Sequence, residues 1–454
     1  MPKLKFVVIS LIAAGTLSPA FAQSNDDILK ELRALKSRVE QLEEQLKTEQ
    51  AKPRVDPADF NRIAVKAESL EDNVEALGFK GLKISGAIDP TYVYNRAQKS
   101  SSFAFLNNFS GDGLYTYDNS YFGMASLDIQ KEMDSGTKWR LTLAPHKSAG
   151  GNYNIGSIVH EASVSIPLGN QQTRFFAGQF PDWSGYESFL PHQNRFITHN
   201  MLFDYVAPTF ITGAGLDITN GKWVTKAMVG NFNSPRYGAG QQSPVLSYRV
   251  DYSKGEFSGF GVAGQHGKIG NANGGVSAVN MIEFDGFFIR GPLTLQGQVA
   301  LGQQKKAAFN GGDSRWYGAS ALAAYKLTPR FELAVRGDYL NNSRNGGGTF
   351  NVGFNAQCYK DAAGADQACG DTRNGFGPAL GFSSDAGQWQ VVDANKGVDR
   401  YALSFGMNYV LNANATVKLE YRYDQASGRV FSYVNDGSFR KANQIFGAST
   451  VVSF

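Results

Sequence analysis

Charged side chains recur at every second position inside apolar stretches, and this spacing is the main chemical signal in the chain. In residues 417–424, for example, Lys418, Glu420 and Arg422 alternate with aliphatic and aromatic residues. Successive side chains of a β-strand point to opposite faces, so such a strand has one charged face and one apolar face. Charges gathered on one wall attract or repel ions. The spacing therefore predicts an electrostatic surface for small polar or charged molecules.

The candidates for this charged surface carry both signs. Counting by parity along the apolar stretches places the following side chains on the charged face: Lys138, Arg140, Lys226, Arg249, Asp251, Glu283, Asp285, Arg336, Asp338, Lys418, Glu420 and Arg422. The four arginines of this set could form one basic column that selects ions. Alternatively, each arginine pairs with a nearby carboxylate, as Arg422 could with Glu420 or Asp424, and the charges only hydrate the wall. Both interpretations remain open.

A long segment at 181–208 carries a second group of polar residues. Its candidates are Asp182, Glu187, His192, Arg195 and Asp204. If the segment folds inward, these side chains narrow an aqueous passage. If the segment stays outside the fold, it forms a lid that packs on the outer rim of the passage. A few histidines near carboxylates are a weak indication of a metal site, so we expect no metal.

No arrangement typical of catalysis accompanies these charges. The five histidines are scattered along the chain, and no Gly-x-Ser-x-Gly motif occurs. We therefore expect no enzymatic activity and no cofactor, and an enzyme on the rim of a barrel is the competing hypothesis. By alternation, His160 shares the apolar register of Ile158 and Ala162.

Short and long connections alternate strictly between the predicted strands. Seven short turns contain Asp134-Ser135-Gly136, Gly169-Asn170, Asn220-Gly221, Lys254-Gly255, Gly291-Pro292, Thr328-Pro329 and Asn412-Ala413-Asn414. Eight longer segments lie at 96–118, 148–156, 181–208, 233–244, 268–277, 305–314, 341–398 and 425–441. A soluble sandwich has no reason to sort its connections in this way. The pattern predicts an all-β fold, a transmembrane antiparallel β-barrel of about 16 strands whose apolar face meets lipid and whose charged face meets water.

The C-terminal residues 442–454 form the last predicted strand. Phe446, Ala448, Thr450, Val452 and Phe454 share one face, and the other face is smaller and more polar near the end. A terminal strand must still pair its backbone groups, and closure of a barrel onto the first strand satisfies them.

The N-terminal part divides into three predicted segments before the barrel at 81–454. Residues 1–22 have a basic start, an apolar core and a small-x-small cleavage site, which predicts a signal peptide. Residues 23–50 place apolar residues at alternating spacings of four and three, which is typical of a coiled coil. The alternative is a single amphipathic helix on the barrel or a partly frayed spacer. Residues 51–80 read as a helical linker after Pro53 and Pro57.

The composition of the chain limits the classes of partner and the ways of membrane insertion that are open to it. A net charge of +4 over 454 residues does not indicate a nucleic-acid partner. No later stretch approaches the roughly 20 apolar residues of a transmembrane helix, so membrane insertion requires a closed barrel. The only two cysteines, Cys358 and Cys369, are expected to form a disulfide in an exported protein, the alternative being two free thiols.

The whole pattern resembles Gram-negative outer-membrane porins, and most closely the OmpL-like group. Gly178-Gln179-Phe180 followed by Tyr205-Val206-Ala207-Pro208 carries that likeness, and the stalk is also similar to phosphate-selective porins with an N-terminal coiled coil. The resemblance implies a passive channel for small hydrophilic solutes in outer-membrane lipid, often a homotrimer, with its stalk in the periplasm. It also implies that Phe454 is read by the barrel-assembly machinery. A structural protein that tethers the envelope through its coiled coil is the alternative.

Overall fold

A computed structural model describes residue 30 and residues 33–41, 43–44, 62–66, 79–104, 123–144, 158–208, 210–232, 244–270, 276–349 and 376–454. The chain divides into two compact units, Met1–Gly78 and Phe79–Phe454. In the first unit, residues 33–41 and 62–66 are helical, and the helix at 33–41 exposes Leu35 and Val39. Its association into a coiled coil stays a prediction. The expected disulfide and signal peptide lie outside the described residues.

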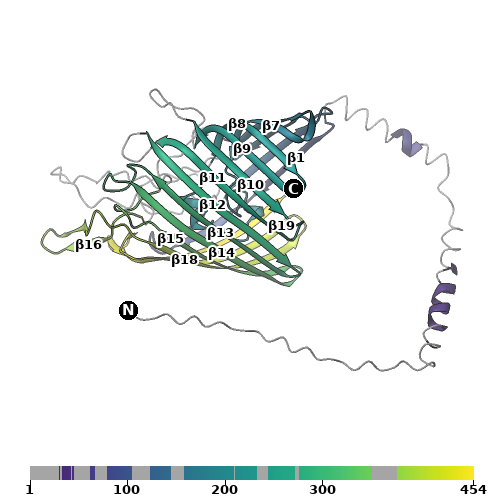
Figure 1. The fold of residues 1–454 in the computed structure, drawn as a ribbon. Helices are drawn as coiled ribbons and strands as arrows, with labels where there is room; N and C mark the ends of the chain where they lie inside the picture. The colour runs from purple at the N-terminus through teal and green to yellow at the C-terminus, as the bar shows by residue number, and fades with distance from the viewer. Residues whose placement is uncertain are drawn as a thin grey trace. The chain divides into compact units, whose positions relative to one another are not determined.

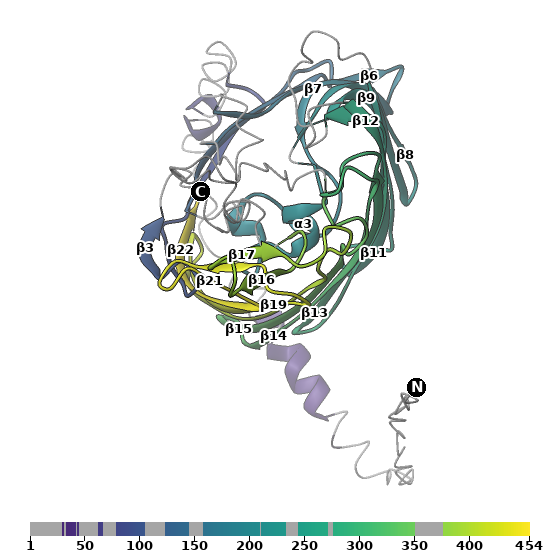
Figure 2. The same cartoon turned by 90° about the vertical axis from the view of Figure 1, so that its left-hand side faces the viewer.

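The last strand closes the second unit into a barrel (Figures 1 and 2). Strand β22 (Ala442–Ser453) pairs with β19 (Ala415–Ala426) on one edge and with β1 (Leu82–Ile88) and β2 (Thr91–Asn95) on the other. The backbone of Phe454 completes the junction by exchanging two hydrogen bonds of 3.1 Å with Gly86. A Cβ atom on Gly86 would lie 2.8 Å from the Phe454 ring, so glycine leaves room for the terminal side chain. Among the described strands, the last pairs with the first, and the predicted closure is confirmed.

The wall contains sixteen antiparallel strands, as the alternation predicts. The first consists of β1 and β2, interrupted at Asp89 and Pro90, where proline lacks a backbone donor. The second consists of β3 (Ser100–Ala104), which pairs with β2, and β4 (Ala125–Glu132), which pairs with β1. The others are β5 (Lys138–Leu143), β6 (Val159–Leu168), β7 (Asn170–Pro181), β8 (Phe210–Asn220), β9 (Trp223–Phe232), β10 (Val245–Ser253), β11 (Ser258–Gly270), β12 (Val276–Arg290), β13 (Leu293–Gln304), β14 (Ser314–Thr328), β15 (Phe331–Asn341), β18 (Arg400–Asn412), β19 and β22.

The expected turns and loops fall between these strands with one correction. All seven short turns lie at one end of the barrel. At the other end, β16 (Leu380–Ser383) pairs with β17 (Gln388–Val391), and β20 (Phe431–Tyr433) pairs with β21 (Ser438–Arg440). The expected single loop at 96–118 is wrong, because the chain turns at 96–99 and β3 runs back along β2. Five residues that begin with three serines are too short and too polar to show an alternating strand in the sequence.

Side chains alternate between the two faces of the wall. Along β18, Phe405 is 51% exposed whereas its neighbour Ser404 is fully buried. Near the loop end, the rings of Tyr317, Tyr339 and Tyr401 follow one another at centroid distances of 6.1 and 5.1 Å. Near the turn end, Trp223, Tyr252 and Phe260 form a second aromatic group. Two aromatic girdles that flank an apolar band are typical of a barrel wall in a lipid bilayer.

Within the described residues, no helix is both long and apolar enough to cross a membrane.

The outward face makes a testable distinction between lipid and water. On β18, Phe405 lies four residues from Tyr401 of the loop-end girdle and four residues from Tyr409 near the turn end. We expect Phe405→Arg to destabilise the folded barrel by about 2–4 kcal/mol, because the charge enters the bilayer centre. Val434 is exposed in the turn of the β20–β21 hairpin, so Val434→Arg is the matched control, with an effect within about 0.5 kcal/mol. Urea unfolding of the protein in lipid vesicles measures both. Equal costs at the two positions would contradict a lipid-facing wall.

Candidate functional site

The segment between β7 and β8 enters the barrel instead of standing above it. We call residues 182–208 the inner loop. Figure 2 shows its helix α3 (Met201–Tyr205) inside the ring of strands. The short 3-10 helix η2 (Pro191–Gln193) begins at a proline, and Asn200 caps α3 by accepting bonds from the amides of Leu202 and Phe203. These local turns give the loop a defined path across the interior.

A buried arginine of β15 holds the middle of the inner loop. Arg336 forms a salt bridge of 2.8 Å with Glu187 and donates to the carbonyl oxygens of Thr198, at 2.8 Å, and His199, at 3.0 Å. Its side chain is fully buried, and its guanidinium lies 4.6 Å from the centre of the Phe196 ring. A guanidinium offers five donors in a fixed plane, so one side chain can fix several parts of a loop at once.

Three charged residues of β19 bind the backbone of the same loop. Glu420 accepts hydrogen bonds of 2.7 Å from the amides of Ile197 and Thr198. Arg422 donates to the carbonyl of His199 at 2.7 Å. The Lys418 ammonium donates to the carbonyl of Pro191 at 2.6 Å and also to that of Asn194. The alternating charges that stand out in the sequence therefore anchor a loop.

The beginning of the inner loop is held by a third group. Arg249 of β10 pairs with Asp251 and Asp285 at 2.7 Å each and donates to the Trp183 carbonyl at 2.8 Å. The first of these carboxylates lies on the same strand and the second on β12. Further along the loop, Arg195 lies 3.3 Å from a carboxylate oxygen of Glu332. Charged contacts thus run from β10 to β19 along one side of the interior.

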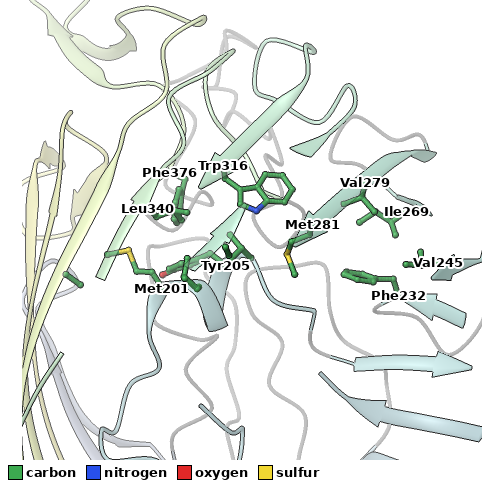
Figure 3. Packing of buried hydrophobic residues seen from close by; sticks show 14 residues of the cluster. Met201, Tyr205, Phe232, Val245, Ile269, Val279, Met281, Trp316, Leu340 and Phe376 are labelled. Atoms are coloured by element: carbon green, nitrogen blue, oxygen red, sulfur yellow. The ribbon is translucent and has the colours of Figure 1, made fainter. Parts of the chain in front are cut away.

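Apolar contacts also hold the inner loop against the barrel wall. Figure 3 shows the buried cluster in which Met201 and Tyr205 of α3 lie near Leu340 and Phe376, and the rings of Tyr205 and Phe376 are 4.7 Å apart. A second contact crosses toward β6, where the Phe189 ring stacks on the His160 imidazole at 3.5 Å. The two clusters hold opposite parts of the inner loop.

The inward position of His160 corrects the sequence interpretation. Its register with Ile158 and Ala162 predicts the lipid side, yet the side chain is buried. The pairing of β5 with β6 slips by one residue after Thr142, which faces Glu161 while Leu143 faces Val159. A β-bulge of this kind turns a side chain to the other face, and it has no signature in the alternation.

Burial changes the acid–base properties of the loop. It raises the pKa of the Asp182 carboxyl to about 6, although hydrogen bonds from Ser184 oppose the change. Because the folded state holds this proton more tightly than the unfolded chain, the stability of the folded state falls as the pH rises through 6. Acidification through pH 6 restores that stability. Burial also raises the pKa of Glu187, with Arg336 opposing it, and lowers the pKa of His192.

Two cavities open on the turn-end half of the interior. One, of about 460 Å³, is lined by charged residues and by a group of aromatic side chains, Trp139, Phe176, Phe180 and Trp183. The other, of about 400 Å³, lies beneath η2 and is lined by His192, Arg195 and residues of the short turns. Both cavities have enough polar and charged side chains in their lining to hold water and small polar molecules.

The structure divides the sequence candidates into two groups. Lys138, Arg140 and Lys226 line the 460 Å³ cavity. The remaining candidates lie close to the inner loop or its anchors, and several that parity assigned to a water-lined wall are instead buried: Glu283, Arg336, Asp338, Lys418, Glu420 and Arg422. Asp204 is buried on α3. The reason is that the inner loop covers the wall from β12 to β19.

Each of the four candidate arginines pairs with a nearby carboxylate. Arg140 pairs with Asp128 at 2.7 Å and Glu161 at 3.2 Å, and Arg422 pairs with Asp424 at 3.1 Å. The other two have the partners described above. Of the two open interpretations, the structure therefore favours paired charges over a column of free cations.

Several residues of the site carry no charge and escape detection in the sequence. Thr198 donates its hydroxyl to Glu420 at 2.6 Å, and Tyr186 bonds to Ser320 at 2.6 Å. Asn200 reaches Gln298 at 3.1 Å. The available signal is the density of turn and cap residues in the inner loop, which predicts order but no partner.

A closed sixteen-strand barrel with an apolar outer belt and a loop folded into its interior defines the class of outer-membrane porins. Residues 81–454 match the family described as "Putative beta-barrel porin-2, OmpL-like", and the chain belongs to this family. The resemblance to OmpL-like porins is thereby confirmed, and the protein is a channel-forming protein of the outer membrane.

Solved structures agree on the fold. OmpT of Vibrio cholerae in its trimer form is 13% identical, with a TM-score of 0.50 over 82% of this chain and 99% of that one. OprB of Pseudomonas putida, in its high-pH structure, is 8% identical, with a TM-score of 0.51 over 84% of this chain and 96% of that one. No curated protein sequence matches the chain. At such identities, the likeness extends to the barrel fold alone.

The anchoring by Arg336 can be tested by proteolysis. We expect Arg336→Met to loosen the inner loop by about 3–5 kcal/mol, because it leaves Glu187 and the loop carbonyls without their buried cation. Trypsin should then cut after Arg195 faster than in the unaltered protein, as mass spectrometry of the fragments would show. Arg140→Met, which removes a paired arginine from the opposite wall, is the control. Equal cleavage rates in the two variants would contradict this role for Arg336.

Proposed function

We propose that the protein is a passive diffusion channel for small hydrophilic solutes, and that the inner loop sets its narrowest passage. The observation that carries this proposal is the inner loop itself, which is fixed to β10, β15 and β19 by buried charges rather than lying free. A loop held at several points keeps a constant cross-section, and a barrel of about sixteen strands is wide enough for an aqueous bore.

The residues nearest the solute path follow from the cavities. Lys138, Arg140 and Lys226 line the larger cavity, each with a carboxylate partner within 3.8 Å. Paired charges present both donors and acceptors to a passing solute. His192 and Arg195 line the smaller cavity under the inner loop. We propose these five as the side chains that hydrophilic solutes meet.

The same proposal covers assembly and partners. The helix at 33–41 exposes Leu35 and Val39 at coiled-coil spacing, which supports a homotrimer joined by a periplasmic stalk. One of the similar solved structures, OmpT of Vibrio cholerae, is described as a trimer form. Phe454 ends the closing strand with an exposed ring, which supports its reading by the barrel-assembly machinery. No catalytic step is part of this proposal.

Single-channel recording tests the function. Purified, heat-modifiable protein in a planar bilayer should give stepwise conductance, and replacing 183–204 by a short glycine-serine link should raise the size of each step, because the interior is widened. Shortening the exposed turn 384–387 between β16 and β17 is the control and should leave the step size unchanged. A correctly folded protein without steps, or an excision without effect, would contradict the proposal.

A further inference from the structure

The outer surface of β11 to β14 changes character at its loop end. On these strands the outward side chains are apolar below Tyr317, but beyond this ring they become polar. His266, Asn280, Gln303 and Arg315 face one another in register across the four strands. The next row adds Lys268, opposite Ala278, and Lys305, whose amide bonds to the Ala278 carbonyl at 2.9 Å. We call these six polar residues the basic patch.

The patch points away from the barrel. Arg315 is exposed, whereas its neighbours Ser314 and Trp316 are buried. Lys268 is likewise exposed beside the buried Ile269. None of these cations therefore faces the interior.

The height of the patch places it in a headgroup layer. Arg315 lies two residues beyond Tyr317 of the aromatic girdle, and a strand rises about 3.4 Å per residue. Arg315 thus stands about 7 Å along the strand from the ring that marks the edge of the apolar band, and the two lysines of the next row stand about 7 Å further out. A charge on the lipid face is tolerated at the interface and costly deeper in the bilayer.

Charges near the patch leave a positive balance. Lys305 pairs with Asp313 at 2.6 Å, and this ion pair depresses the pKa of the Asp313 carboxyl. Immediately before β18, the Asp399 carboxylate accepts a hydrogen bond of 2.9 Å from the Asn341 side chain of β15. His266 bonds to Asn280 at 3.0 Å, which orients its ring along the row. Lys268 lies on β11 and Arg315 on β14, at the two ends of this row of strands.

We propose that the basic patch binds the phosphate groups of the glycolipid in the outer leaflet. Arg315 offers a planar pair of donors that fits a phosphate, and the two lysines add compact charges. Asn280 and Gln303 supply neutral donors between them for sugar hydroxyls. Neighbouring strands lie about 4.8 Å apart, so the row of four spans about 14 Å. A headgroup with two phosphates on a sugar backbone matches that spread of charge.

Binding of purified lipid A to protein refolded without glycolipid tests the site. Native mass spectrometry should show the bisphosphorylated form bound to the unaltered protein. Lys268→Gln, Lys305→Gln and Arg315→Gln together should weaken that binding at least about tenfold at low salt. Asp313→Asn should tighten it, because the change frees Lys305 and removes a negative charge. These two variants act in opposite directions, so a folding defect cannot explain both.

Matched controls identify the ligand. Lys222, Lys254 and Arg290 are exposed at the turn end, and changing all three to glutamine should leave binding unaltered. Dephosphorylated lipid A should bind weakly, and inorganic phosphate should fail to displace the lipid. Equal binding by both triple variants, equal affinity for the dephosphorylated lipid, or displacement by inorganic phosphate would each overturn the proposal. Channel conductance serves as a separate readout and should persist in every variant.

Discussion

Closure of the sheet is the constraint on which the other features depend. In lipid, no water is available for backbone donors and acceptors, so every strand must find partners on both edges. Here β22 meets β19 on one edge and the first wall strand on the other. Closure separates the side chains into two populations with different solvents. The outer face carries aliphatic and aromatic residues between aromatic girdles, and the inner face is free to carry charge.

The buried charges of the inner face are compensated by several bonds each to the inner loop. Arg336, Glu420 and Lys418 would be costly to bury alone, but each bonds to the inner loop at more than one point. Many of these bonds go to loop amides and carbonyls, so they fix the path of the loop with few demands on its side chains. Removal of one anchor leaves charged partners buried without compensation, which is why the contacts act together. The path of the inner loop thus rests on buried wall charges, Arg336, Glu420 and Lys418.

Much of the wall could be predicted from the sequence, because lipid on one side and water on the other impose a period of two. Stretches such as 401–411 and 417–424 show this clearly, and strict sorting of turns from loops gives the strand number. The alternation fails where the backbone departs from it. The β-bulge that turns His160 inward inserts one extra residue into β6 and so shifts the alternation there. Strand β3 is too short to show an alternating pattern.

The site could be predicted only in part, for a related reason. Parity identifies which face Arg336 and Glu420 occupy, but it carries no information about what covers that face. The inner loop reaches the wall through Thr198, Ile197 and other residues that contribute backbone groups, and every residue has these. Charged residues in the loop, such as Glu187, indicated polar contacts without naming a partner. Tertiary folding of one long connection decides which charges meet solvent.

Nitroxide scanning along β18 tests the central claim most directly. Single labels at positions 401 to 409, in protein whose two cysteines are replaced by serine, would be placed in lipid vesicles and their collision rates measured with oxygen, which dissolves in lipid, and with a water-soluble nickel complex. High oxygen accessibility at Leu403, Phe405 and Met407, with low values at Ala402 and Ser404, is the expected result. Accessibility that does not alternate with a period of two would contradict a wall that separates lipid from an aqueous interior.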